Sequence, residues 1–209
     1  ELIQVHGESK KLSKHLHLPV QSGSRSVLKR MNRQYTPEHY LGLLEKLRKS
    51  QPEIVLSTDI IVGFPNETEE EFQMTLDLLD KAQFDFIYSY AFSPRRYTRA
   101  ANMEDFLTDD IRGERLRYLQ RYQLKIQEKI RSQMVGKSYR VLVDGQSKMK
   151  GEKKWKGRTN CNRLVHFKPP QEDQNFQWHW VDLKVTSATS LSCQGELEAD
   201  YGRKPPQYH

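Results

Sequence analysis

The sequence predicts an α/β region followed by a small β-barrel, and two observations support this expectation. Strand-like and helix-like segments alternate up to Leu107, which is typical of parallel βα units that place their helices outside the sheet. After one long helix, five short strand-like segments follow, separated by Gly, Ser, Asn, Pro and Lys. This second pattern indicates a small β-barrel.

The first half of the chain contains three expected strands separated by helices. Residues 54–63 are rich in β-branched side chains and almost continuously apolar, as expected for a parallel strand buried on both faces. Thr36 followed by Pro37 marks the start of one helix, and Thr68 with Glu71 forms a capping box that starts another. We expect strands at residues 15–21, 54–63 and 84–92, and helices at residues 24–31, from 36 to 51 and from 68 onward.

The second half begins with a long basic helix. Apolar residues recur at helical spacing from Thr108 to about Met134, and Gly136 ends the pattern. Five segments typical of strands follow, at residues 139–143, 155–158, 164–167, 180–186 and 195–197. The expected domains are βα units at residues 1–107, a basic linker helix at 108–136, a β-barrel at 137–197 and a flexible tail at 198–209.

Charge is unevenly distributed along the chain. Residues 1–107 contain 14 Lys and Arg against 15 Asp and Glu, whereas residues 108–209 contain 20 against 12. A neutral half joined to a basic half is typical of a protein whose second half meets a polyanion such as RNA or DNA. A solvated basic surface without a partner would have the same composition.

Cysteine usage and hydropathy limit the metal chemistry and the compartment. Cys161 and Cys193 are 32 residues apart, a spacing that matches no metal-binding motif. No stretch approaches the roughly 18 apolar residues of a membrane span, and residues 1–14 do not resemble a signal peptide. We therefore expect reduced thiols in a cytoplasmic protein.

Candidate ligand-binding residues follow the first two expected strands, at the end where (βα) barrels place their active sites. Gln21 and Ser22 could hydrogen-bond a ribose or an amino-acid head group, or they could form an ordinary polar turn. After the second strand, Gly63 would let a flat ligand approach the backbone. Val62 and Phe64 would supply apolar contact to an adenine-like ring.

Charged residues mark the second and third expected strands. Asp59 lies inside an apolar strand, and a buried carboxylate needs a partner. It is either satisfied structurally or directed into a polar barrel lumen. After the third strand, Arg95, Arg96 and Arg99 could hold phosphate at the mouth of a barrel, or they could be solvated surface residues.

Basic and aromatic residues are interleaved in the expected β-barrel. Basic side chains can neutralise phosphates while aromatic rings stack on unpaired bases, so we favour RNA as the ligand over a hairpin kept soluble by its lysines. The basic residues are Lys148, Lys150, Lys153, Lys154, Lys156, Arg158 and Arg163, and the aromatic ones are Trp155, His166 and Phe167.

Five motifs, in this order and spacing, resemble the radical SAM tRNA methylthiotransferases, and most closely the MiaB subgroup. The resemblance covers nearly the whole chain up to about Leu197, and the combination of motifs is specific. The motifs are HLPVQSGS at residues 17–24, RMNRQYTPEHY at 30–40, STDIIVGFPNETEEEF at 57–72, YAFSPRRYTRAA at 90–101 and GRTNCNRLVHF at 157–167.

The resemblance implies a fold and an activity for the parent protein. It implies the carboxy-terminal half of a TIM-like (βα) radical SAM barrel at residues 1–107 and a five-stranded TRAM domain at residues 137–197. Similar enzymes methylthiolate isopentenyl-adenosine next to the anticodon of tRNA. They use S-adenosylmethionine and two [4Fe–4S] clusters, each held by three cysteines in an amino-terminal portion that this chain does not contain.

The resemblance also implies roles for individual residues. S-adenosylmethionine would contact Gln21, Ser22, Val62, Gly63 and Phe64, and the substrate nucleotide would face Asp59, Arg95 and Arg96. The implied tRNA contacts are Lys153, Lys154, Lys156, Arg158, Asn162 and Arg163.

Three departures from the family pattern change what we expect of this chain. Neither set of cluster-binding cysteines is present, so we expect the chain alone to be inactive. Asn66 stands where similar proteins often have Gly, and the segment after Ser93 lacks their Pro-Gly pair. Two alternatives remain open: a non-catalytic RNA-binding fragment, and a relative of the enzymes that methylthiolate a ribosomal protein. GRTNCNRLVHF favours the tRNA-directed subgroup.

Overall fold

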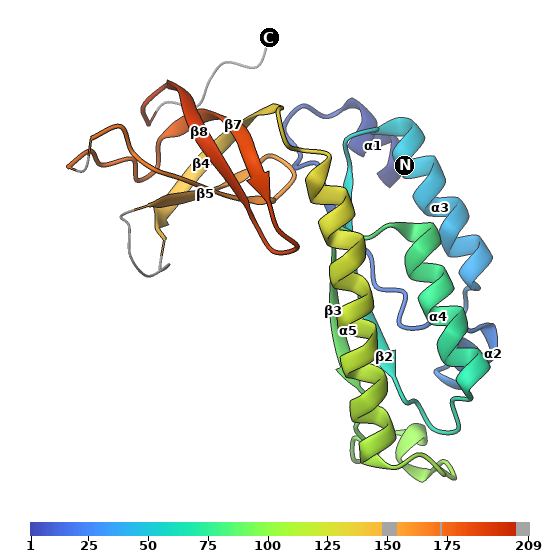
Figure 1. Ribbon diagram of the computed structural model, residues 1–209. Coiled ribbons are helices and arrows are strands. Elements are labelled where there is room, and N and C mark those ends of the chain that lie inside the picture. The colour runs from blue at the N-terminus through green and yellow to red at the C-terminus, as the bar shows by residue number, and fades with distance from the viewer. Residues whose placement is uncertain (148–153, 172, 204–209) are drawn as a thin grey trace. The chain divides into compact units, whose positions relative to one another are not determined.

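The computed structural model describes residues 1–147, 154–171 and 173–203, and the chain divides into two compact units (Figure 1). The sheet unit contains residues 16–52 and 56–126. The barrel unit contains residues 1–15, 53–55 and 127–209. Helix α5 (Asp109–Ser132) and the first residues of two strands are shared between the units.

A three-stranded sheet in the order β1-β2-β3 organises the sheet unit. Strand β2 (Val55–Val62) pairs in parallel with β3 (Phe86–Ala91), in a register that sets Asp59 beside Tyr88 and Ile61 beside Tyr90. Strand β1 (His15–His17) is shorter than the expected strand, because pairing is interrupted after His17 and resumes only at Gln21, which bridges to Ile60. The carboxyl ends of the three strands therefore meet at one edge.

Helices cover the sheet and begin where the sequence places their caps. Helix α2 (Arg25–Arg30) is capped by Ser24, α3 (Pro37–Ser50) by Thr36, and α4 (Glu69–Ala82) by the expected capping box of Thr68 and Glu71. Figure 1 shows α3 and α4 side by side. Helix α5 contacts this unit through Gln123, whose amide donates to the carbonyl of Phe84 at 2.7 Å.

A closed barrel in the order β4-β5-β6-β8-β7 forms the barrel unit and confirms the five expected strands. The strands are β4 (Ser138–Gln146), β5 (Trp155–Thr159), β6 (Leu164–Phe167), β7 (Trp180–Ala188) and β8 (Cys193–Asp200). Neighbours are antiparallel except β6 and β8, which are parallel. The interior is filled by large side chains, including Trp155, Phe167, Phe176 and Leu183.

Two features of the barrel unit differ from the sequence expectations. Strand β8 continues to Asp200, past the expected boundary at Leu197, because its pairing with β7 extends to Val181. Helix α1 (Leu2–Glu8) was not expected, since it is short and lacks an apolar stripe; His6 is its one buried residue. Among the residues that the structure describes, none of the helices combines the length and apolarity that crossing a membrane requires.

Candidate ligand cavity and nucleic-acid interface

A cavity of about 750 Å³ lies at the carboxyl ends of the strands of the sheet unit. This volume is in the range of small-molecule sites. Its wall combines the apolar side chains of Ile61, Phe64 and Phe92 with the phenol of Tyr90 and polar or charged side chains from several segments. The charged and amide-bearing residues are Gln21, Arg30, Asn32, Arg33, Asp59, Arg95 and Arg99.

Asp59 is the acidic residue in the wall of this cavity, and it has a structural partner as well. Nε2 of His17 lies 3.3 Å from Oδ1 of Asp59, and Nδ1 of the same ring lies 2.9 Å from Oγ of Ser57. The ring of His17 also contacts Tyr88 edge to face. The carboxylate is therefore paired with His17 on one side and also borders the cavity; its place in a barrel lumen stays a prediction.

Arg30 borders the cavity and is anchored to helix α4. Its guanidinium donates two hydrogen bonds to the carboxylate of Glu71, at 2.7 and 3.0 Å, and a third to the carbonyl of Asn66 at 3.3 Å. Burial raises the pKa of Glu71, but the hydrogen bonds from Arg30 and Ser26 outweigh it and lower the pKa to about 2. The buried Nε of Arg30 has no hydrogen-bond partner in the described part of the chain.

Helix α5 fixes the turn after β2 through hydrogen bonds from its arginines. Gly63 has a φ of +67°, its N–H donates to the carboxylate of Glu67 at 2.8 Å, and its carbonyl accepts from Arg112 at 2.9 Å. A Cβ on Gly63 would lie 2.4 Å from Cγ of Arg112. Arg112 therefore fills the space that a side chain at position 63 would take. The contact of Gly63 with a ligand that the sequence predicts stays a prediction.

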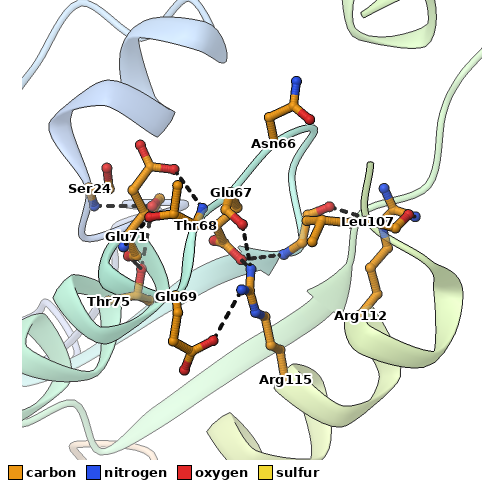
Figure 2. Close-up of polar contacts among 12 residues, drawn as sticks. Ser24, Asn66, Glu67, Thr68, Glu69, Glu71, Thr75, Leu107, Arg112 and Arg115 are labelled. Atoms are coloured by element: carbon orange, nitrogen blue, oxygen red, sulfur yellow. Dashed lines mark hydrogen bonds and ion pairs between the residues drawn. The ribbon is translucent and has the colours of Figure 1, made fainter. Parts of the chain in front are cut away.

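A buried ion pair supports the same turn. Nη1 of Arg115 lies 2.9 Å from Oε2 of Glu67, and Nη2 lies 3.1 Å from Glu69 (Figure 2). Burial raises the pKa of Glu67, while the N–H of Gly63 and the charge of Arg115 act in the opposite direction. The turn that carries Phe64 into the cavity wall is thus fixed by two arginines of α5.

The residues proposed from sequence fall into two groups. Gln21, Asp59, Phe64 and Arg95 line the cavity. Ser22 and Val62 are completely buried, and Oγ of Ser22 accepts from the N–H of Ser24 and lies 3.4 Å from Oγ1 of Thr75. Gly63 faces Arg112. Arg96 is exposed and is not among the residues that line the cavity.

Sequence reasoning missed Arg30, Arg33 and Tyr90 as cavity residues. Tyr90 could have been found, because it lies at the end of β3 in register with Ile61. Arg30 ends helix α2 and Arg33 lies three residues further on, and only the folded chain brings them to the ends of β2 and β3.

Several proposed RNA contacts lie together on the outer face of the barrel. On β5 the side chains alternate, so that Trp155, Gly157 and Thr159 are buried while Lys156 and Arg158 face outward. Lys156 is in register with His166 of β6, which in turn is in register with Gln194 of β8. Lys154 reaches Gln194 with an Nζ to Oε1 distance of 3.4 Å.

The loop between β5 and β6 adds to this face. Asn162 has a φ of +68°, and its side-chain and backbone oxygens accept from Arg158 at 3.2 and 3.1 Å. The N–H of Arg163 donates to Thr159. Asp144 partly offsets the positive charge, since it lies 3.9 Å from Lys156 and 3.7 Å from Arg158. Lys148, Lys150 and Lys153 lie outside the described residues.

His166 is the least solvated polar residue of this face. Burial lowers its pKa, and the positive charges of Lys156 and Lys154 lower it further. The ring is therefore neutral at physiological pH, and its buried Nδ1 has no hydrogen-bond partner within the described ranges. Because only 6% of its surface is exposed, the ring lies beneath the lysines and offers little surface to a ligand.

The described residues offer no site for a metal cluster. Cys161 and Cys193 are buried free thiols of the barrel unit, in contact with Thr159 and Met134 respectively. No group of three or more His, Cys, Asp or Glu in the described ranges is placed to hold a metal ion.

Comparison with known proteins finds relatives for nearly the whole chain. Residues 6–79 match the Radical SAM superfamily. Enzymes named tRNA-2-methylthio-N(6)-dimethylallyladenosine synthase are 43% identical in Thermoanaerobacter sp. (strain X514), 42% in Geobacillus kaustophilus (strain HTA426) and 41% in Legionella pneumophila (strain Corby). Each alignment covers 94% of this chain but 41%, 36% and 43% of the relative, respectively.

Part of the sheet unit is therefore similar to radical SAM proteins. Nearly the whole chain is similar to the tRNA-2-methylthio-N(6)-dimethylallyladenosine synthases, and it spans about two fifths of their length.

Proposed function

We propose that this chain is the portion of a radical SAM tRNA methylthiotransferase that binds the substrate nucleotide and the tRNA. The parent protein would methylthiolate isopentenyl-adenosine next to the anticodon. One observation carries the proposal: identity to the tRNA-2-methylthio-N(6)-dimethylallyladenosine synthases runs continuously through the sheet unit and the barrel unit. The three-stranded sheet would then be part of a (βα) barrel, completed by an amino-terminal portion that carries the cluster ligands.

The cavity residues fit S-adenosylmethionine, whereas those of this chain do not fit an iron–sulfur cluster. The amide of Gln21 and the carboxylate of Asp59 can hydrogen-bond ribose or ammonium groups, and Phe64 offers an apolar wall to adenine. Ser22 and Val62 would support these residues from behind, because both are fully buried. When bound beside a cluster, S-adenosylmethionine supplies a carbon-centred radical. The cluster requires thiolates, which this chain lacks at the cavity.

Charged residues around the cavity would orient a nucleotide. Asp59 is held by His17 and presents an acceptor for an N–H or O–H group. Tyr90 and Phe64 line the cavity with aromatic rings, and Arg95 and Arg99 line it with positive charge. These residues bind and orient; the described part of the chain provides no group that would carry out sulfur transfer.

The barrel unit would hold the tRNA as a TRAM domain. Its outer face combines Lys154, Lys156, Arg158, Asn162 and Arg163, with the buried His166 beneath them. Cationic side chains neutralise phosphates, and each released counterion contributes to a salt-dependent affinity. Lys153 remains a candidate contact outside the described residues.

The charge of this face can be tested by tRNA binding at several salt concentrations. We expect the double variant Lys156→Gln/Arg158→Gln to bind tRNA more weakly and to lower the slope of log K against log salt by roughly 1 to 2. Lys184→Gln is the matched control, since Lys184 is exposed on β7, two strands away from β5 around the barrel. An unchanged slope in the double variant would remove the RNA-binding role of this face.

A second function, that of a non-catalytic RNA-binding fragment, is favoured by the absence of cluster ligands in the described residues. Calorimetry with S-adenosylmethionine distinguishes the two. For an enzyme portion that needs its cluster-binding partner, we expect weak binding or none to this chain and recovery when the amino-terminal portion is added. A low-micromolar dissociation constant for the chain alone would contradict the dependence on the missing portion.

A further inference from the structure

The segment of residues 93–107 carries two of the arginines that border the cavity, and its last part is fastened to the turn after β2. The side-chain amide of Asn66 donates to the carbonyl of Glu104 at 2.8 Å, and its Oδ1 accepts from the N–H of Phe106 at 3.2 Å. Asn66 has a φ of +57°, and its exposed side chain stands at the tip of the turn (Figure 2). One exposed side chain therefore fastens two backbone groups of the segment.

Arg112 holds the same segment from the other side. It donates to the carbonyl of Leu107 at 2.8 Å, forms an ion pair with Asp105, and binds the carbonyl of Gly63 at 2.9 Å. The segment is also folded on itself, since Thr98 Oγ1 donates to the carbonyl of Arg95 at 2.7 Å ahead of the short helix η1 (Arg99–Asn102). The segment is therefore fixed to the sheet unit at Asn66 and Arg112.

The arginines on this segment lack acidic partners. Within the described ranges, neither Arg95 nor Arg99 forms an ion pair or a side-chain hydrogen bond, and the same holds for Arg33, which also lines the cavity; all three side chains are exposed. Arg30, by contrast, is neutralised by Glu71. Three uncompensated guanidinium groups around one cavity favour an anionic ligand group, and guanidinium matches the oxygens of a phosphate.

We propose that Asn66 is a positioning residue that holds residues 93–107 against the cavity, so that Arg95 and Arg99 receive a phosphate group of the substrate. The holding role stands on the contacts alone, and the identity of the phosphate as that of a nucleotide rests on the proposed function. A glycine at position 66 would keep the turn, because φ of +57° suits Gly, but it would release Glu104 and Phe106.

Hydrogen exchange on the full chain tests the holding role without any ligand. In Asn66→Gly the Phe106 amide loses its acceptor, and we expect it to exchange about tenfold faster, together with residues 95–105. Asn66→Asp keeps an acceptor for Phe106 but loses the donor to Glu104, so the increase should be smaller. Gln83→Gly is the control, since Gln83 also has a left-handed backbone (φ +49°) and its side chain bonds only within α4's end. Equal exchange in wild type and Asn66→Gly overturns the proposal.

Binding of adenosine 5′-monophosphate and of adenosine tests the phosphate role. The measured quantities are the two dissociation constants and the arginine side-chain NMR shifts. We expect wild type to favour the monophosphate and Asn66→Gly to lose most of that preference, while its affinity for adenosine and its melting temperature stay close to wild type. No preference in wild type, or a preference unchanged in Asn66→Gly, overturns the phosphate assignment. Neither result depends on the tRNA slope measured on the barrel face.

Discussion

The carboxylate of Glu67 and the guanidinium of Arg115 form an ion pair of 2.9 Å between side chains that are 0% and 10% exposed. Oε2 of Glu67 also accepts from the N–H of Gly63, so one carboxylate joins helix α5 to the turn after β2. Because burial raises the pKa of Glu67, the ionised carboxylate depends on Arg115 for compensation.

Removing one partner of this pair should be more harmful than removing both. We expect Arg115→Leu to lower the free energy of unfolding by about 3–5 kcal/mol, because a charge is left buried without compensation. The double variant Arg115→Leu/Glu67→Leu should lose clearly less. Urea denaturation of the two variants measures the difference, and a double variant less stable than Arg115→Leu would contradict it.

Acid should weaken the contact between Arg30 and Glu71. The pKa of Glu71 is lowered from 4.5 to about 2, so its ionic contribution to stability is complete above pH 4.5 and is lost as pH falls towards 2. We expect Glu71→Gln to be less stable than wild type at pH 7 by about 1–3 kcal/mol, with the gap closing between pH 4.5 and 2. Gln preserves the capping box, so the comparison isolates the charge. A gap of constant size over this range would show that the charge contributes nothing.

Two glycines of the sheet unit should respond in opposite ways to alanine. Gly63→Ala puts a Cβ 2.4 Å from Arg112 in a left-handed backbone, and we expect a loss of about 1–3 kcal/mol. Gly42→Ala lies inside α3 with no atom within 4 Å of the new Cβ, and we expect a gain of about 0.5–1 kcal/mol. Thermal unfolding of both variants tests the pair, and a stabilised Gly63→Ala would show that Arg112 moves aside freely.

Gly157 of the barrel should not tolerate a side chain. A Cβ there would lie 2.4 Å from the carbonyl oxygen of Leu142 and 2.6 Å from Cγ1 of Val141. The first neighbour is backbone of the paired strand β4, so the clash would have to separate the strands. We expect Gly157→Ala to destabilise the barrel by about 1–3 kcal/mol or more, measured by urea denaturation against wild type. Wild-type stability in this variant would mean that β4 and β5 yield at little cost.

Local signals predicted the elements well because their causes are local. Thr36 and Thr68 cap helices through contacts within three residues, so the sequence alone sufficed to place the starts of α3 and α4. The interleaving of Lys156 and Arg158 with Trp155 in the sequence agrees with the alternation of buried and outward residues on β5. Position after a strand drew attention to Gln21, Phe64 and Arg95, and an apolar surrounding sequence drew attention to Asp59; all four line the cavity.

Contacts between distant segments account for what sequence reasoning missed. Ser22 looked available for a ligand, but the packing of α4 buries it beside Thr75. The sequence around Gly63 does not show that Arg112 of α5 fills the space that a side chain there would take. No residue pattern near Arg30 and Arg33 indicated that they would line a cavity. They reach it because the end of α2 is held near the turn after β2 by the ion pair of Arg30 with Glu71 of α4.

The position of β8 in the barrel has a consequence for how the chain folds. This strand inserts between β6 and β7, so the ring cannot close until the last of its five members has been synthesised. During translation β6 and β7 would each present a bare edge, and such edges invite pairing with other chains. The exposed edges of β6 and β7 are therefore covered, and protected from pairing with other chains, only when residues 193–200 have been synthesised and have paired.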